Sequence, residues 1–425
     1  MFKNKGKSKN KRGVIKLFSV TAAMALFLGG ALFAWTGCDE ETAEVGAVSE
    51  LDDRLVDANT GFGLELLRNI HEEEGEENLF ISPASISLAL SMTYQGADGD
   101  TKEEMAEVLG YEGIELEELN QANADLLTVL GRPDEGVEMS LANSIWKREE
   151  VDFYEDFMEV NEEYYDAEVQ ALDFGDPEAS DIINQWVEEE TRGHIEDIVD
   201  DDIDPLTIMF LINALYFQGD WALPFDEEKT SEQTFYLPEG EEIEVPMMQQ
   251  QEDLAYLEKD DFQAVRLPYG EEERVSMYVF LPSEEVGLEG FYNKLKGEVW
   301  ENWLEDFETI EGNLQLPRFD MEYEVELKNY LEGMGMDTAF HSNKADFGNM
   351  RDITQQNTYL SSAKHKTFVE VDEKGTEAAA ATSVEVGVES ALPESFNMTV
   401  NRPFFFAIQD DATGALLFAG SVVEP

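Results

Sequence analysis

Cysteine, histidine and basic residues are all scarce in this sequence of 425 residues. The single cysteine, Cys38, leaves no partner for an internal disulfide bond. The four histidines form no His-Glu-x-x-His motif, and no Gly-x-Ser-x-Gly turn is present. No glycine-rich nucleotide loop follows a predicted strand. We therefore expect no enzyme activity, no bound metal and no cofactor.

The charge balance excludes two classes of partner. The sequence has 28 Lys and Arg against 94 Asp and Glu, a net charge of −66. Nucleic-acid binding needs clustered basic residues, and an anionic membrane would repel the folded domain. A surface covered by carboxylates stays soluble where salt screens its self-repulsion, so we predict a salt-loving source organism. A calcium site is an alternative reading of the acidic runs, but the Asp-x-Asp-x-Asp-Gly loop pattern is missing.

The N-terminal segment has the features of an export signal. Seven Lys and Arg residues precede the first acid, and the stretch Leu17–Cys38 contains neither charge nor proline. The triplet Thr36-Gly37-Cys38 resembles a bacterial lipobox, in which lipid is attached to the cysteine. Trp35 departs from the aliphatic residue usual in that motif. The alternative is an uncleaved membrane anchor, because the apolar stretch is nearly long enough to span a bilayer.

The sequence therefore divides into three parts. Residues 1–38 are an export signal or anchor with lipid attachment at Cys38, residues 39–50 are a short acidic tether, and residues 51–425 are the folded domain. No repeat and no linker rich in Pro, Gly or Ser interrupts the folded domain. We expect an exported protein, extracellular or at the cell surface, that contacts the membrane only through its N-terminal tether.

Hydrophobic spacing in the folded domain predicts a mixture of helices and strands. Ser82 and Pro83 are typical of a helix start, and the residues from there through Tyr94 are apolar nearly all round, which predicts a buried helix. The apolar run Leu206–Phe217 is rich in β-branched and aromatic residues and predicts a central strand. Other predicted elements include strands at Met139–Trp146, Leu314–Phe319, Phe368–Val371 and Phe404–Gln409, and helices at Tyr154–Tyr165, Pro177–Glu190 and Val325–Met334. The pattern is that of an α+β protein with mainly antiparallel sheets.

The segment Val371–Pro393 has an unusual pattern. After Gly375, the residues Thr376–Glu389 alternate between an uncharged face and a face that carries three carboxylates, as in a strand with one buried side. No proline interrupts Thr376–Leu392, so each backbone N–H could join a sheet. The small side chains of Ala378–Ala381 suit a segment that slides between two existing strands. An alanine-rich helix followed by a loop is the alternative.

Five ordered segments resemble the serpin family, and the resemblance spans about Leu51 to Pro425. The segments are Asn78–Ser85, Asn213–Trp221 with Pro224-Phe225, Glu373–Thr382, Asn401–Phe404 and Phe418–Gly420. The resemblance implies a serpin fold with three mainly antiparallel sheets, about nine helices and an exposed reactive-centre loop. It also implies a monomeric inhibitor of a serine protease, which is cleaved by its target and traps it by inserting the cut loop into the main sheet.

Two other functions stay open beside trapping of a serine protease. One is a non-inhibitory serpin that acts as a binding module, and the other is a cross-class inhibitor of cysteine proteases. Non-inhibitory serpins usually carry bulky or charged residues or proline in the hinge. Here the hinge keeps its small residues, which favours inhibition.

The resemblance assigns roles to particular residues. The hinge comprises Glu373, Gly375, Thr376, Ala378, Ala379, Ala380 and Ala381. A polar "shutter" beneath the sheet comprises Ser82, Ser85, Asn213 and His365, and the "breach", where the loop first inserts, comprises Trp221 and Arg318. The plain structural alternatives are satisfied buried polar groups for the shutter, core packing for Trp221, and an exposed Arg318–Glu373 pair that contributes little.

The usual family spacing from Glu373 places the reactive bond between Glu389 and Ser390. Glutamate before the cut predicts a target protease that prefers acidic residues and has a basic pocket. The length of the following segment leaves Val388 and Leu392 as alternative specificity residues.

Overall fold

A computed structural model describes residues 51–425 except 76, 132–135, 196, 201, 202, 205, 239, 355, 356 and 377–394, and except the side chains of 140, 141 and 214. Several predictions lie outside the described residues. They concern the segments 1–38 and 39–50, Cys38, Ala378–Ala381, Glu389, Ser390, and the alternatives Val388 and Leu392.

Nine α-helices are present in the described residues, which agrees with the expected number. They are α1 (Asp53–Glu74), α2 (Pro83–Tyr94), α3 (Gly99–Leu109), α4 (Leu116–Leu130), α5 (Glu155–Tyr165), α6 (Ala179–Glu190), α7 (Gly287–Tyr292), α8 (Gly297–Glu305) and α9 (Lys328–Met334). Within the same ranges, no helix is both long and apolar enough to cross a membrane.

Helix α2 begins as the sequence predicts. The Ser82 side chain caps it by accepting a hydrogen bond from the Ser85 N–H, and Pro83 occupies the first turn, where a missing N–H costs nothing. Eleven of its twelve residues are buried. The helix packs against the two large sheets of the molecule at once, through strands β4 and β15, which explains why it is apolar on nearly every side.

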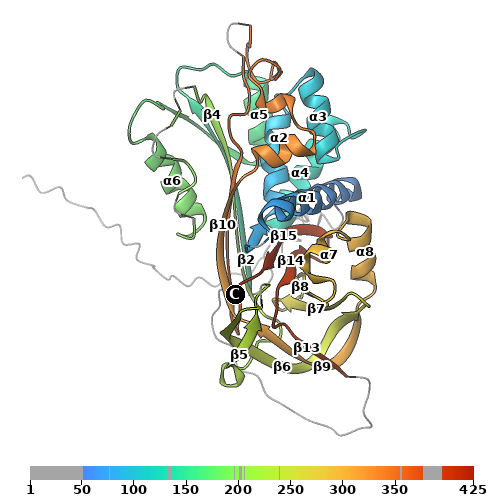
Figure 1. Cartoon of the computed structure of the whole chain (residues 1–425). Helices are drawn as coiled ribbons and strands as arrows, with labels where there is room; N and C mark the ends of the chain where they lie inside the picture. The colour runs from blue at the N-terminus through green and yellow to red at the C-terminus, as the bar shows by residue number, and fades with distance from the viewer. Residues whose placement is uncertain are drawn as a thin grey trace, which may run out of the picture. The chain divides into compact units, whose positions relative to one another are not determined.

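One sheet has six strands and carries the site described below. Its order is β10 (Phe319–Glu326), β11 (Lys364–Val371), β12 (Gly375–Thr376), β4 (Met209–Asp220), β2 (Val137–Arg148) and β3 (Ala167–Leu172). All neighbours are antiparallel except β2 and β3. Helix α6 covers one face of this sheet, and α1 and α2 lie on the other side (Figure 1).

The remaining strands form a nine-stranded network. Along it run β1 (Leu79–Ile81), β15 (Ala415–Val422), β14 (Phe404–Asp410), β8 (Val275–Pro282), β7 (Phe262–Tyr269), β6 (Glu242–Glu258), β9 (Glu308–Pro317) and β13 (Phe396–Thr399), and β5 (Ser231–Tyr236) pairs with β6. Strand β6 pairs with β5 and β9 along most of its length and with β7 at its end. It therefore joins two sheets, so that the described residues form the three mainly antiparallel sheets expected.

Several predicted boundaries are wrong. Strand β4 runs from Met209 to Asp220 rather than from Leu206 to Phe217, and β11 begins at Lys364, four residues before Phe368. The expected strand Leu314–Phe319 is two strands, because β9 ends at Pro317 and β10 begins at Phe319. Between them the Arg318 N–H turns to the carbonyl oxygen of Pro246. The helix expected from Val325 begins only at Lys328, because the strict alternation of buried and exposed residues in β10 continues to Glu326.

Candidate functional site

The six-stranded sheet contains an opening between β4 and β11. Among the described residues these two strands share no backbone ladder and are joined only through the two residues of β12. Gly375 pairs with Asp220, and Thr376 pairs with Gly219 on one side and Val371 on the other. We call the interval beyond Thr376, between residues 209–218 and 364–370, the β4/β11 opening. The predicted hinge therefore already starts a new strand at one end of this opening.

A tight turn brings the hinge back from β11. The Asp372 carboxylate accepts hydrogen bonds from the N–H groups of Lys374 and Gly375, and the Asp372 N–H donates to the Gly375 carbonyl. Gly375 has a φ of 155°, and a Cβ atom there would lie 1.9 Å from the carbonyl oxygen of Gly219. Only glycine fits this position, because the hinge backbone lies directly against β4.

Thr376 is fully enclosed at the end of the opening. Its side chain is 3% exposed, and its hydroxyl shares a hydrogen bond of 2.9 Å with the Tyr269 hydroxyl. Burial raises the pKa of Tyr269 well above its usual range, so this phenol stays neutral. Thr376 thus faces the core, as the uncharged face of the predicted strand requires. The sequence did not indicate Tyr269 as its partner.

Glu373 is buried beside the hinge and is paired. Arg318 Nη2 lies 2.5 Å from Glu373 Oε1, and the Thr230 hydroxyl donates to the same oxygen. Burial raises the pKa of the Glu373 carboxyl, but the hydrogen bonds from Arg318 and Thr230 outweigh this effect and hold the pKa below its usual value. The Glu373 side chain is 2% exposed and that of Arg318 43%, so the alternative of a fully exposed pair is wrong.

Trp221 combines core packing with contacts to the hinge turn. Its ring stacks on Tyr269 at 4.3 Å and is 4% exposed. Its indole N–H donates to the Asp372 carbonyl at 2.9 Å, and its backbone N–H donates to the Lys374 carbonyl at 2.7 Å. The predicted breach residue therefore holds the turn from which the predicted hinge starts.

The shutter residues lie further along the opening, and two of them form one group on the β11 side. His365 Nε2 accepts a hydrogen bond of 3.0 Å from the Ser82 N–H, and the Ser82 hydroxyl donates to the Leu417 carbonyl at 2.7 Å. Burial lowers the pKa of His365 to about 3, so the imidazole stays neutral and can act as an acceptor. This group attaches β11 to the start of α2.

The other two shutter residues form a group on the β4 side. The Ser85 hydroxyl donates to Asn213 Oδ1, and Asn213 Nδ2 donates to Asn143 Oδ1 at 2.6 Å. Asn143, on β2, donates in turn to the Tyr165 carbonyl at 2.6 Å. The first turn of α2 therefore contacts both sides of the opening, through Ser82 and Ser85. The sequence did not indicate Asn143, which looks like any polar residue in a strand.

The arrangement of the site suits the binding of an extended strand. Its polar groups are paired with one another, and in the described part of the chain no group of three or more His, Cys, Asp or Glu residues is placed to hold a metal ion. What the opening can accept is extended backbone, because the described parts of β4 and β11 both pair with the short strand β12 and share no ladder with each other.

Comparison with known proteins places the chain in a family. The family model described as serpin (serine protease inhibitor) matches residues 57–425. Serpin B10 of Otolemur garnettii is 36% identical over 402 residues, which covers 88% of this chain and all of the relative. The leukocyte elastase inhibitor of Xenopus laevis is 33% identical over 383 residues, with the same shares covered. The chain belongs to the serpin family.

Solved structures agree with this assignment. The thermophilic serpin tengpin in its native state has a TM-score of 0.81 and 33% identity over 88% of this chain and 95% of its own. The latent state of tengpin gives a lower TM-score of 0.75. Human thyroxine-binding globulin complexed with its hormone has a TM-score of 0.79 and 28% identity over 87% of this chain and 98% of its own. Members of this fold thus include a binding protein as well as protease inhibitors.

Proposed function

We propose that this protein is an inhibitory serpin that traps a serine protease as a suicide substrate. The protease serine attacks the carbonyl of Glu389, the amine of Ser390 leaves with a proton, and an acyl-enzyme ester forms. The segment from Thr376 then inserts between β4 and β11 and carries the attached protease along before water can cleave the ester.

The observation that carries this proposal is the start of β12. Thr376 already pairs with both Gly219 and Val371, and its side chain is accepted by the core. Beyond it, β4 and β11 have no ladder to each other among the described residues. Each backbone hydrogen bond that an inserted strand adds contributes about 0.5–1.5 kcal/mol. The sum of these bonds is the driving force that we propose for trapping.

The alternative function, a binding module without trapping, is supported by the existence of thyroxine-binding globulin among similar structures. The small side chains of the hinge and the pairing of Thr376 with both neighbouring strands favour trapping over this alternative. A cross-class inhibitor of cysteine proteases would use the same opening and differ only in the reactive bond.

The experiment is to mix the purified domain with a panel of serine and cysteine proteases. We expect a covalent complex stable in SDS with a serine protease that prefers acidic residues. Mass spectrometry of the small released fragment should give a new N-terminus at Ser390. An N-terminus at Glu389 or Pro393 would move the specificity residue to Val388 or Leu392. Cleavage without any complex would refute the trapping mechanism.

Export and anchoring are a separate part of the proposal. The basic start, the apolar stretch Leu17–Cys38 and the Thr36-Gly37-Cys38 motif support lipid attachment and a cell-surface location. Cys38→Ser should abolish fatty-acid labelling and release the protein from the membrane. Unchanged membrane association without any label would favour an uncleaved anchor.

A further inference from the structure

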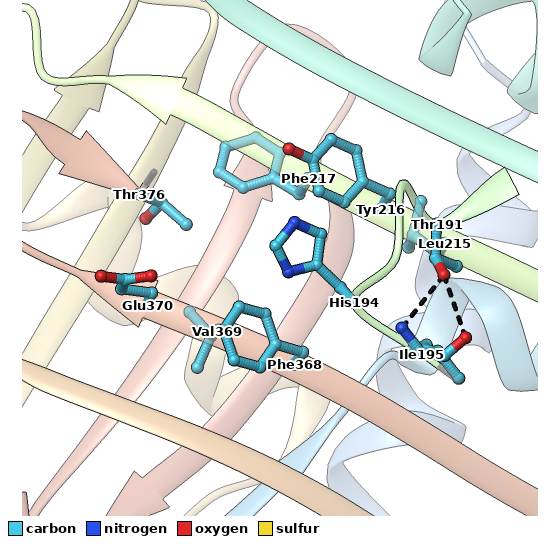
Figure 2. A pocket seen from close by; sticks show the side chains of 10 residues that line it. All are labelled: Thr191, His194, Ile195, Leu215, Tyr216, Phe217, Phe368, Val369, Glu370 and Thr376. Atoms are coloured by element: carbon cyan, nitrogen blue, oxygen red, sulfur yellow. Dashed lines mark hydrogen bonds between the residues drawn. The ribbon is translucent and has the colours of Figure 1, made fainter. Parts of the chain in front are cut away.

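His194 lies across the β4/β11 opening. It belongs to the segment that follows α6, and its ring stacks on Tyr216 of β4 at 5.3 Å and on Phe368 of β11 at 4.9 Å. The interplanar angles are 18° and 20°. Figure 2 shows the imidazole between these two rings, with Thr376 further along the same opening. The three rings form one row across strands that share no backbone ladder.

The spacing of this row is that of adjacent strands. Neighbouring strands lie about 4.8 Å apart, and side chains directly opposite each other on one face are separated by a similar distance. The His194 ring is about one strand spacing from Tyr216 and one from Phe368. It therefore occupies the position that a side chain from a strand between β4 and β11 would take.

The register of β12 identifies which side chain that would be. Thr376 lies opposite Gly219 and Val371, and both pairings are antiparallel. If both antiparallel pairings continue for three residues beyond Thr376, residue 379 lies opposite Tyr216 on β4 and Phe368 on β11. Thr376 faces the core, so residue 379 would face the other side of the sheet, where Tyr216 and Phe368 present their rings to His194. His194 thus stands where the side chain of residue 379 must go.

Little free space remains around this ring. The cavity between His194 and Thr376 holds about 10 Å³, and Phe217, Val369 and Glu370 also line it. That volume is about enough for one water molecule. An inserting strand cannot pass residue 378 while the imidazole stays in place.

The segment that carries His194 is also attached to strands on both sides of the opening. Arg192 forms an ion pair with Glu138 of β2, and its guanidinium lies 5.4 Å from the centre of the Tyr216 ring. On the β11 side, Lys366 Nζ donates to the Asp197 carbonyl at 3.3 Å, and Lys364 Nζ pairs with Asp200 at 2.8 Å. Residues 192–195 and 197–200 therefore form a strap across the sheet, with His194 as the group that enters the opening.

We propose that His194 is a removable plug that sets the rate at which the sheet accepts a new strand. Insertion competes with hydrolysis of the acyl-enzyme, so the plug would determine what fraction of the attacking protease molecules is trapped. This link between the plug and trapping rests on the proposed function. His194 is a positioning residue in this account, since it touches neither the protease nor the reactive bond.

The test measures strand insertion without any protease. A synthetic peptide of residues 377–388 (EAAAATSVEVGV) is incubated with the intact protein, and the rise of the complex is followed by native gel shift and mass spectrometry. His194→Ala should anneal about tenfold faster, because two aromatic contacts no longer have to break before the strand passes. His194→Phe keeps the stacked row and should anneal at the wild-type rate or more slowly.

A control variant distinguishes removal of the plug from a general loss of stability in the region around α6. Ile183 is buried in α6 within the smaller core cluster and does not line the cavity, so Ile183→Val weakens the same region without clearing the opening. It should leave the annealing rate unchanged. Equal rates for His194→Ala and wild type, or equal acceleration by Ile183→Val, would overturn the proposal. The two proposals can fail separately. If the His194 variants anneal the peptide at the expected rates but the protein traps no protease, the proposed function is wrong and the role of His194 as a plug is still supported.

Discussion

The two ends of the β4/β11 opening are held in different ways. At the hinge end, backbone fills the space, because Gly375 and Thr376 pair with strands on both sides and Thr376 reaches the buried hydroxyl of Tyr269. At the shutter end, the start of α2 contacts the two strands separately, because the Ser82 N–H donates to His365 and the Ser85 hydroxyl donates to Asn213. The hinge end is therefore a guide for a new strand, and the shutter end is a polar closure that insertion must rearrange.

The largest effect should come from a charge at the hinge end. In Thr376→Arg a guanidinium replaces a hydroxyl that is 3% exposed, and burial of an unpaired charge costs several kcal/mol. The loop would then be cut before it inserts, so inhibition should turn into substrate turnover. The measurement is the number of inhibitor molecules consumed per protease trapped, which should rise more than tenfold.

Thr376→Ser is the matched control for this change. It keeps the hydroxyl that bonds Tyr269 and should trap protease at nearly the wild-type ratio. Trapping by Thr376→Arg at the wild-type ratio would mean that residue 376 does not remain in the core during insertion.

The shutter end should respond to acid. The pKa of His365 is about 3 in the folded protein and about 6.5 in an unfolded chain, so the unfolded state binds the proton first as pH falls. The stability linked to His365 is complete above pH 6.5 and is lost progressively between pH 6.5 and 3, by as much as about 5 kcal/mol. Urea unfolding at a series of pH values measures this slope.

His365→Gln provides the comparison for the pH series. Its amide oxygen can accept from the Ser82 N–H and does not titrate, so the slope between pH 6.5 and 4.5 should flatten. Below pH 4.5 the hinge end contributes as well, because the pKa of Glu373 is lowered and its stabilisation is lost as that carboxylate is protonated. An unchanged slope in His365→Gln would show that His365 is not the titrating group.

A smaller effect is expected from the ion pair at the hinge end. Arg318→Ala leaves the buried Glu373 carboxylate with only the Thr230 hydroxyl, which should lower the free energy of unfolding by about 2 kcal/mol. Adding Glu373→Gln should recover part of that loss, since a neutral amide tolerates burial better. Thermal and urea unfolding of the single and double variants give the coupling energy. Additive losses would mean that the two side chains act independently.

The local pattern of residue types in the sequence predicted much of the fold. The cap at Ser82, the buried helix after it and the alternating strands follow from spacing and residue type. The boundary at Arg318 was missed because Leu314–Phe319 reads as one apolar run, although Pro317 and Arg318 separate β9 from β10.

The site was predicted only in part, and distance along the chain explains the rest. Ser82 and Asn213 lie in segments with a recognisable order, so resemblance found them, and His365 was assigned by its position in the family. The contacts of Thr230 with Glu373 and of Tyr269 with Thr376 join residues 143 and 107 positions apart. No local pattern marks such a contact, since it exists only once the sheets are assembled. The same holds for His194, whose segment has no regular periodicity.

The most direct test of the account is the stability of the protein after one cut in its loop. If the opening between β4 and β11 is a place for a missing strand, a nick within Val384–Leu392 releases the segment from Thr376 to insert and complete the six-stranded sheet. The thermal midpoint of the nicked protein should then rise by tens of degrees above that of the intact protein, as measured by calorimetry at equal salt and pH. Equal midpoints for the intact and nicked proteins would contradict the central claim.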